Sequence, residues 1–447
     1  MNKTRKHFTH ANILSKIHSS FLAKTQKLNK NYNIKTSDCL MAGLAIFALK
    51  YPSLLKFEED RATIDHIKHN LKSLYHVSQA PCDTYLRERL DGFDITIIRS
   101  ICTELIALMQ RGKVLENWKF LDNKFLISLD ASGFFSSNKI KCNHCCTKVH
   151  NRGTGKERTT YHHQMLVGSV VSPLMKQVLP VNFEPMIKED GDAKNDCERS
   201  CAKRWLNNFR RAYPRLPTVI VADGLYSNGP FIRDLQERNC SYVITAKEDD
   251  HKYLYDYFWA GKGEDIGQFE SSYAKTVNSK RVDHYNSSYR FMNNVPLNDT
   301  NYDLKVNVLH YTEVDLRQSK TTIWCWVTDI EITKDNAEQL MQSGRARWKI
   351  ENETFNTLKN QGYNFGHNFG HGKKGLSNVF AGLMLLAFLI DQCLEAVNLE
   401  FKAAITKYKS RSNLFSKIRG KFVEFKITNF DRLYEHMLHG PPGEFVL

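Results

Sequence analysis

Residues 125–130 have the sequence FLISLD, a short apolar run that ends at the carboxylate of Asp130. Runs of this length with a polar end are typical of a strand in the core of an α/β domain. Residues 218–223 repeat the pattern as TVIVAD and end at Asp223. Either aspartate alone could be an ordinary turn cap. At the ends of adjacent strands, however, the two charges would repel each other unless a cation lay between them.

A third carboxylate is predicted from helical spacing. We expect one long helix from about Asn336 to Lys359, in which Glu351 lies in an apolar stripe and Glu353 points to roughly the opposite side. The stripe also contains Trp348, Phe355 and Leu358. A carboxylate in a buried stripe must be paired, protonated or bound to metal. The alternative to a metal ligand is an ion pair with Arg347, four residues before Glu351.

Three carboxylates are suitable ligands for Mg²⁺ (or Mn²⁺), which keeps some waters and accepts phosphate oxygens from a substrate. Two such ions could stabilise both the attacking and the leaving oxygen of a phosphodiester reaction. We therefore predict that Asp130, Asp223 and Glu351 are catalytic residues that hold two divalent ions. Arg347 beside them could hold phosphate. Trp348 is expected to pack in the core, with stacking on an unpaired base as the alternative.

The chain has 447 residues, a formal net charge of +15 and a pI of about 9.2, which favours a polyanionic partner such as double-stranded DNA. Residues 1–37 contain eight basic side chains and no acidic one, and a second basic run lies near the C-terminus. We expect these two segments to grip separate stretches of phosphate backbone. The second run comprises Lys402, Lys407, Lys409, Arg411, Lys417, Arg419, Lys421 and Lys426, against Glu424 alone.

The cysteine content and the apolar runs indicate a cytosolic protein without a membrane partner. Eleven cysteines, an odd number, and a charged N-terminus without an apolar signal region favour free thiols in a reducing cytosol. The longest apolar run, Val379 to Ile390, is too short to span a bilayer and predicts a buried helix.

At these carboxylates the chain resembles the Asp-Asp-Glu (DDE) transposases of bacterial insertion sequences, in the branch with a β-strand insertion between the second Asp and the Glu. The stretches that match best are residues 127–130, 221–226 and 347–355, and the long gap between Asp223 and Glu351 agrees with the insertion. A weaker resemblance includes residues 194–198, residues 367–372 and the apolar helix that follows.

The resemblance implies an RNase H-like fold whose three carboxylates meet at one edge of a mixed sheet. It also implies nicking of transposon ends, attack of a 3′-hydroxyl on target DNA, and a homodimer assembled on that DNA. Five regions are expected: a helical DNA-binding region (1–120), the first part of the catalytic domain (121–249), a β-rich insertion (250–320), the second part with the Glu-bearing helix (321–375), and a helical basic C-terminal region (376–447).

The sequence departs from the branch's helix signature at two positions. The signature has a Tyr three residues before the Arg, where this chain has Gly344. It has a Lys seven residues after the Glu, where this chain has Leu358, with Lys359 one position further on. These departures concern the handling of the DNA end and leave the metal site untouched.

Two further patterns extend the candidate site. Cys142 and Cys145 have zinc-knuckle spacing and could bind a structural Zn²⁺, the alternative being buried free thiols. His367 and His371 flank glycines just after the catalytic helix and could approach the active site or DNA, the alternative being a structural turn. The predicted DNA contacts are Arg347, Trp348, Lys359, His367 and His371.

Three functions remain open from these patterns. The first is an active transposase, and the second is another metal nuclease on the same fold. The third is an inactive DNA-binding protein derived from a transposase, which the three intact carboxylates argue against. The basic N-terminal segment and the β-rich insertion favour the transposase over the other nucleases.

Overall fold

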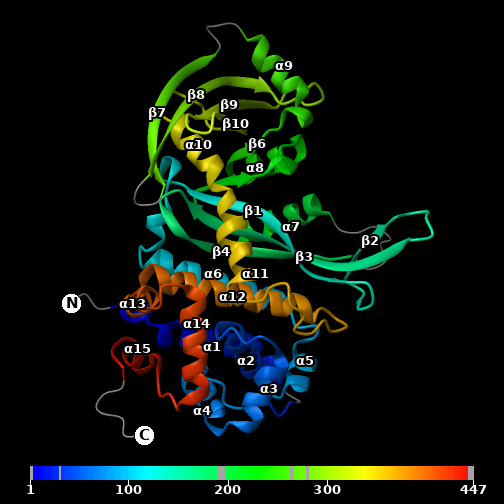
Figure 1. The fold of residues 1–447 in the computed structure, drawn as a ribbon. Helices are drawn as coiled ribbons and strands as arrows, with labels where there is room; N and C mark the ends of the chain where they lie inside the picture. The colour runs from blue at the N-terminus through cyan, green and yellow to red at the C-terminus, as the bar shows by residue number, and fades with distance from the viewer. Residues whose placement is uncertain (1–3, 30–31, 189–196, 262–265, 278–280, 441–447) are drawn as a thin grey trace.

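A computed structural model describes residues 4–29, 32–188, 197–261, 266–277 and 281–440. The chain forms a layer of helices at one end and a sheet that extends to the other, with one helical segment connecting the two (Figure 1). The α/β class predicted from the sequence is thereby confirmed.

The sheet is mixed and has ten strands in the order β2-β3-β1-β5-β6-β10-β9-β8-β7, while β4 pairs with β3. The strands are β1 (Phe125–Ser137), β2 (Cys146–His150), β3 (Arg158–Ser172), β4 (Met175–Met186), β5 (Thr218–Ala222), β6 (Ser241–Thr245), β7 (Gly267–Val277), β8 (Arg281–Pro296), β9 (Lys305–Asp315) and β10 (Lys320–Thr328). The pairs β1–β5 and β5–β6 are parallel, and the other pairs are antiparallel. The apolar run at 218–223 forms β5, as expected. The run at 125–130 forms only the first part of β1, which continues past Asp130 to Ser137, so the expectation of a strand end at Asp130 was wrong; β4 was not predicted.

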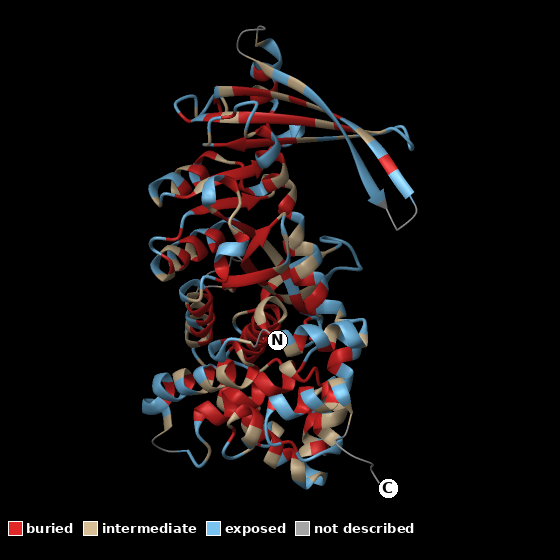
Figure 2. Cartoon of the chain, turned by 90° about the vertical axis from the view of Figure 1, so that its left-hand side faces the viewer, coloured by how far each residue is buried: buried red, intermediate tan, exposed pale blue. Residues whose placement is uncertain are grey.

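The insertion is β-rich, as predicted, but it does not interrupt the sheet. Its strands β7, β8 and β9 follow helix α9 (Lys252–Ala260), and β10 pairs with β9 on one side and with β6 on the other. The inserted strands therefore continue the hydrogen-bonded ladder of the central strands. The hairpin of β7 and β8 extends from the buried sheet as an exposed ribbon (Figure 2).

The helical layer contains both ends of the chain. Its helices are α1 (His10–Thr25), α2 (Thr36–Ala48), α3 (Leu54–Thr63), α4 (Asp65–Tyr75), α5 (Asp83–Leu90), α6 (Ile95–Arg111), α13 (Leu399–Tyr408), α14 (Arg411–Glu424) and α15 (Phe430–His439). Thr4 donates a hydrogen bond to Glu400 over 2.6 Å, and the His10 ring stacks on Phe430. The two basic segments therefore lie in one body, and their grip on separate stretches of phosphate backbone stays a prediction.

Helix α12 (Leu376–Val397) lies between the sheet and the helical layer and packs against α2, α6 and β4. It is longer than the apolar run from which we predicted it. By length and composition alone its 22 residues could cross a membrane, so the prediction of a segment too short to span was wrong. Because 89% of its most apolar window is buried in the fold, it forms the core helix that the sequence indicated.

The segment with Glu351 is not one regular helix. It consists of α10 (Ala337–Ala346), a π-helical turn (Ile350–Phe355) and α11 (Asn356–Asn360). A π-turn adds a residue to the helical path and changes the direction of the side chains that follow. The remaining helices, α7 (Glu198–Ala212) and α8 (Gly229–Glu237), belong to the α/β part of the chain.

Candidate active site

The parallel pairing of β1 and β5 brings the segments that carry the two aspartates side by side. In the parallel pair of β1 and β5, Ser128 is the partner of Val221. Asp130 follows Ser128 by two residues within β1, and Asp223 follows Val221 by two residues, just after the end of β5. Strands paired in this way lie about 4.8 Å apart, so the two aspartates belong to neighbouring segments of the chain. Asp223 also accepts a hydrogen bond from the Leu225 amide over 3.0 Å, so it caps the following turn as well.

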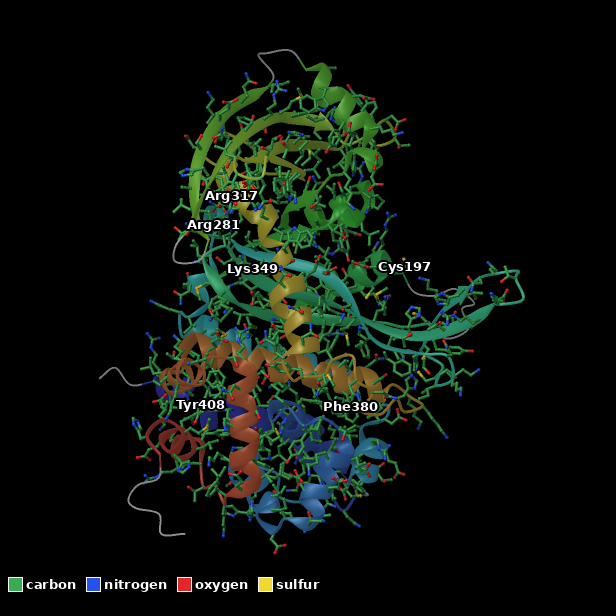
Figure 3. The ribbon with its side chains drawn as sticks, viewed as in Figure 1. Cys197, Arg281, Arg317, Lys349, Phe380 and Tyr408 are labelled. Carbon is green, nitrogen blue, oxygen red and sulfur yellow. The ribbon has the colours of Figure 1, made fainter. Side chains whose placement is uncertain are left out.

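Two hydrogen bonds from the sheet hold the segment that contains Glu351. The buried Ser128 hydroxyl, two residues before Asp130, donates to the Arg347 carbonyl over 3.1 Å. Ser169 of β3 and Thr354 of the π-turn place their hydroxyl oxygens 3.4 Å apart. The π-turn thus packs on the strand that contains Asp130, and Lys349 marks this crossing (Figure 3).

The electrostatics of Asp130 reflect a crowded carboxylate site. Burial, followed by the negative charge of Glu351, raises the pKa of Asp130 to about 7. Glu351 itself is 38% exposed and accepts a hydrogen bond from the Arg347 guanidinium over 2.8 Å. The ion pair that was the alternative interpretation of Glu351 is therefore present. Arg347 only partly offsets the excess of negative charge, so this part of the sheet edge would favour cations.

The π-turn changes which residues of the predicted stripe are buried. Trp348 is 50% exposed, so the expectation that it packs in the core beside Glu351 was wrong. The Arg347 guanidinium lies over its ring, with 4.8 Å to the ring centroid. Ile350 and Thr354 are buried in place of Trp348, because Trp348 precedes the extra residue of the π-turn. Glu353 faces the helical layer, where its carboxylate lies 4.0 Å from Arg411.

The structure gives physical reasons for the two departures from the signature. A Cβ atom on Gly344 would lie 2.4 Å from the Trp326 ring, so this position has no room for a tyrosine. Leu358 is fully buried, whereas Lys359 is exposed. The π-turn adds one residue to the helical path. The residue eight positions after Glu351 therefore points roughly where the residue seven positions after it would point in a regular helix. On this count Lys359, and not Leu358, is the candidate for the expected lysine.

Sequence reasoning missed Glu198 as a member of the site. This residue opens α7, and Tyr226 donates a hydrogen bond to its carboxylate over 2.7 Å. Burial, and then the charge of Asp223, raise the pKa of Glu198, which places it near that aspartate. The signal was present in the stretch 194–198, of which residues 194–196 lie outside the described residues. Cys197, beside Glu198, caps the start of α7 (Figure 3).

The two predicted histidines separate in the structure. His367 is exposed, and its ring packs edge-on against Phe369. His371 is only 6% exposed and faces Cys145, with 3.3 Å between its Nε2 and the sulfur. It therefore does not present a surface to DNA, and the expectation of a DNA contact at His371 was wrong.

Among the described residues, one group of potential metal ligands has its atoms within 4.8 Å of one another, and it contains Cys142, Cys145, His163 and His371. The three predicted carboxylates are not such a group. They belong to β1, to the turn after β5 and to the π-turn.

Comparison with known proteins gives one finding. The family model described as "Transposase DDE domain" matches residues 144–389, more than half of the chain. No curated protein matches the sequence.

Proposed function

The chain belongs to the DDE transposase family and has its RNase H-like fold, and from this premise we propose that it moves an insertion sequence by cutting and joining DNA. In this proposal the protein binds the transposon ends, nicks them by metal-dependent hydrolysis and joins the 3′ ends to target DNA. The observation that supports the proposal is the parallel pairing of β1 and β5 up to Ser128 and Val221, two residues before Asp130 and Asp223, beside the Glu351 segment.

The carboxylates fit a site for divalent cations. Burial and the charge of Glu351 raise the pKa of Asp130 to about 7, so the fold brings acidic groups together at an energetic cost that bound cations would offset. Oxygen ligands of this kind suit Mg²⁺ or Mn²⁺. We propose that Asp130, Asp223 and Glu351 hold two such ions, which would supply charge stabilisation to the attacking and leaving oxygens when bound.

The proposed chemistry has two steps, hydrolysis and strand transfer. In the first, a water oxygen attacks a phosphodiester phosphorus at the transposon end, the bond to the 3′ oxygen breaks, and that oxygen takes a proton to become a free hydroxyl. In the second, this 3′-hydroxyl attacks a phosphodiester of the target, and the target's own 3′ oxygen leaves. The Arg347 guanidinium, held 2.8 Å from Glu351, is positioned to pair with a phosphate oxygen in either step.

Exposed groups beside the carboxylates would contact the DNA. Trp348 presents half of its surface and could stack on an unpaired base, while Lys359 and His367 are exposed further along the same segment. A groove of about 600 Å³ lies between α10 and the β7–β8 hairpin, and its lining includes Lys275 and Lys349. Its basic character suits the phosphate backbone of double-stranded DNA.

We further propose a homodimer assembled on DNA, because a transposon has two ends and each end needs an active site. The protein would act in the bacterial cytoplasm, on the nucleoid, where its DNA substrates are. The net charge of +15 supports a nucleic-acid partner.

A strand-transfer assay tests the proposal. The ends would be taken from the DNA that flanks the gene, as inverted repeats bounded by short direct repeats. A transposase joins these ends to target DNA in the presence of Mg²⁺ or Mn²⁺. Cleavage without joining, or at unrelated DNA as readily as at the ends, would favour another RNase H-like nuclease. Binding without cleavage under all metal conditions would favour an inactive derivative.

A further inference from the structure

Four side chains from three separate parts of the sequence meet beside strand β3. Cys142 and Cys145 come from the connection between β1 and β2, and His163 comes from β3. His371 comes from the glycine-rich turn between α11 and α12, more than 200 residues away in sequence. Their ligand atoms all lie within 4.8 Å of one another.

The distances within this group match the edges of a tetrahedron around one metal ion. The two sulfurs lie 3.8 Å apart, and the two Nε2 atoms lie 3.2 Å apart. Three sulfur–nitrogen distances lie between 3.3 and 3.5 Å. With Zn–S bonds of about 2.3 Å and Zn–N bonds of about 2.0–2.1 Å, tetrahedral geometry requires roughly 3.8, 3.3 and 3.5 Å for these three kinds of edge.

The surroundings of His371 and His163 favour their binding to a metal ion. His371 Nδ1 lies 2.9 Å from the Gly372 carbonyl oxygen, so Nδ1 holds the proton and the lone pair of Nε2 faces the sulfurs. Phe135 packs against the His371 ring with 4.3 Å between ring centroids, and Phe134 stacks on His163. His163 is fully buried and Cys145 nearly so, so the group is shielded from water.

We propose that Cys142, Cys145, His163 and His371 bind one structural zinc ion. Two thiolates and two imidazoles in tetrahedral arrangement are a ligand set that selects Zn²⁺. Four protein ligands complete the coordination and leave no position for a substrate, so the ion would stabilise the fold and take no part in the reaction. This site extends the CxxC pair seen in the sequence by two ligands that no spacing rule indicates.

The position of the ion gives it a specific task. Cys142 follows Asp130 by 12 residues, and His371 follows Glu351 by 20. One ion would therefore tie together the segments that follow two of the proposed catalytic carboxylates. On its other side the glycine-rich turn is held by Asp91, whose carboxylate accepts the amides of Lys373 and Lys374 over 2.7 and 2.8 Å.

The backbone conformation of the glycine-rich turn allows contacts both with Asp91 and with the cysteine–histidine cluster. Gly372 has a φ of +69°, and a Cβ atom there would lie 2.5 Å from the Asp91 carboxylate. Only glycine can bring the chain this close to Asp91 while His371 points in the opposite direction toward the cysteines. The zinc site and Asp91 thus fix the turn between α11 and α12 from two sides.

Metal analysis of the purified full-length protein tests the proposal, with matched controls from neighbouring residues. Cys145→Ser and His371→Asn remove ligands. Cys146→Ser changes the adjacent buried thiol, which lies against the Met186 carbonyl, and His367→Asn changes the exposed histidine of the same turn. We expect about one zinc ion per chain in the wild type and in both controls, and a several-fold lower content in both ligand variants. Wild-type protein purified without chelator and lacking zinc would overturn the proposal, as would equal zinc content in all five proteins.

Two further measurements keep the test independent of folding and of the proposed catalytic ions. Protein with cobalt in place of zinc should show the visible absorption of tetrahedral Co²⁺ with thiolate charge transfer, and octahedral spectra would contradict the ligand set. Asp130→Asn should retain the full zinc content, because its carboxylate lies outside the cluster. Loss of zinc in that variant would mean that the ion is bound by the carboxylates instead.

Discussion

Strand β1 leads to two groups of potential metal ligands, and the fold assembles them to different degrees. In the cysteine–histidine cluster all four ligand atoms lie within 4.8 Å of one another, and three of the four residues are buried. At the carboxylates, Asp130 and Asp223 follow the paired residues Ser128 and Val221 by two positions, but Glu351 is 38% exposed and bonded to Arg347. Each group takes members from β1 or the connection that follows it, and one member from the segment between β10 and α12.

The difference corresponds to what each kind of ion requires. A structural zinc site is closed, so the protein must supply four ligands in final geometry. A catalytic Mg²⁺ site keeps waters and takes oxygens from the substrate, so the protein supplies only part of the coordination. The incompletely assembled carboxylates therefore suit a catalytic site, and the closely packed thiol–imidazole group suits a structural one.

The largest expected effect concerns the two aspartates of the carboxylate group. Asp130→Asn and Asp223→Asn should each reduce metal-dependent cleavage by about a thousandfold or more, because each removes a ligand on which the reaction depends. Folding, DNA binding and zinc content should change little, since both side chains are only partly buried. Cleavage rates, circular dichroism and DNA affinity on the same preparations measure this. Substantial metal-dependent cleavage by either variant would remove the aspartates from the reaction.

A second prediction separates DNA affinity from both ligand groups. Affinity should fall steeply with salt, by roughly 10³–10⁵ between 50 and 200 mM if six to ten phosphates are neutralised. Deleting residues 1–37 would test the basic segment only poorly, because α1 contributes Ile13, Leu14 and Phe21 to the core.

Replacing the exposed Lys16, Lys27 and Lys35 with Gln is the sharper experiment. It should weaken binding and flatten the salt dependence, while Asp130→Asn should leave the slope unchanged. An identical slope for the triple variant and the wild type would exclude this segment from the DNA-binding surface.

The smallest effect concerns stability. In chelator that removes Mg²⁺, Glu351→Gln should have a Tm equal to the wild type or up to about 3 °C higher, because the Glu351 charge adds to the burial that raises the pKa of Asp130. Cys145→Ser should instead lower the Tm of zinc-loaded protein, since metal binding adds to folding stability. Thermal unfolding followed by circular dichroism compares the two. A marked loss of stability in Glu351→Gln would indicate that this residue serves the fold.

The sequence predicted the two strands that carry the aspartates, but not that β1 continues past Asp130 to Ser137, and it predicted the helix poorly. Asp130 and Asp223 were found because each ends an apolar run, which is a local signal. The direction of Trp348 was missed because a uniform helical angle cannot anticipate a π-turn, which arises from packing on β1, β3 and β4. The partnership of Cys145 with His371 depends on tertiary structure across 226 residues, so no spacing in the sequence could indicate it.

Metal-dependent cleavage of one transposon end by Glu351→Gln and Glu353→Gln, measured side by side, tests the central claim most directly. The two residues lie on one π-turn, but Glu351 belongs to the site with Asp130, whereas Glu353 faces Arg411 in the helical layer. Our account predicts that Glu351→Gln loses cleavage by orders of magnitude and that Glu353→Gln keeps much of it. An inactive Glu353→Gln beside an active Glu351→Gln would contradict the account and require another third ligand.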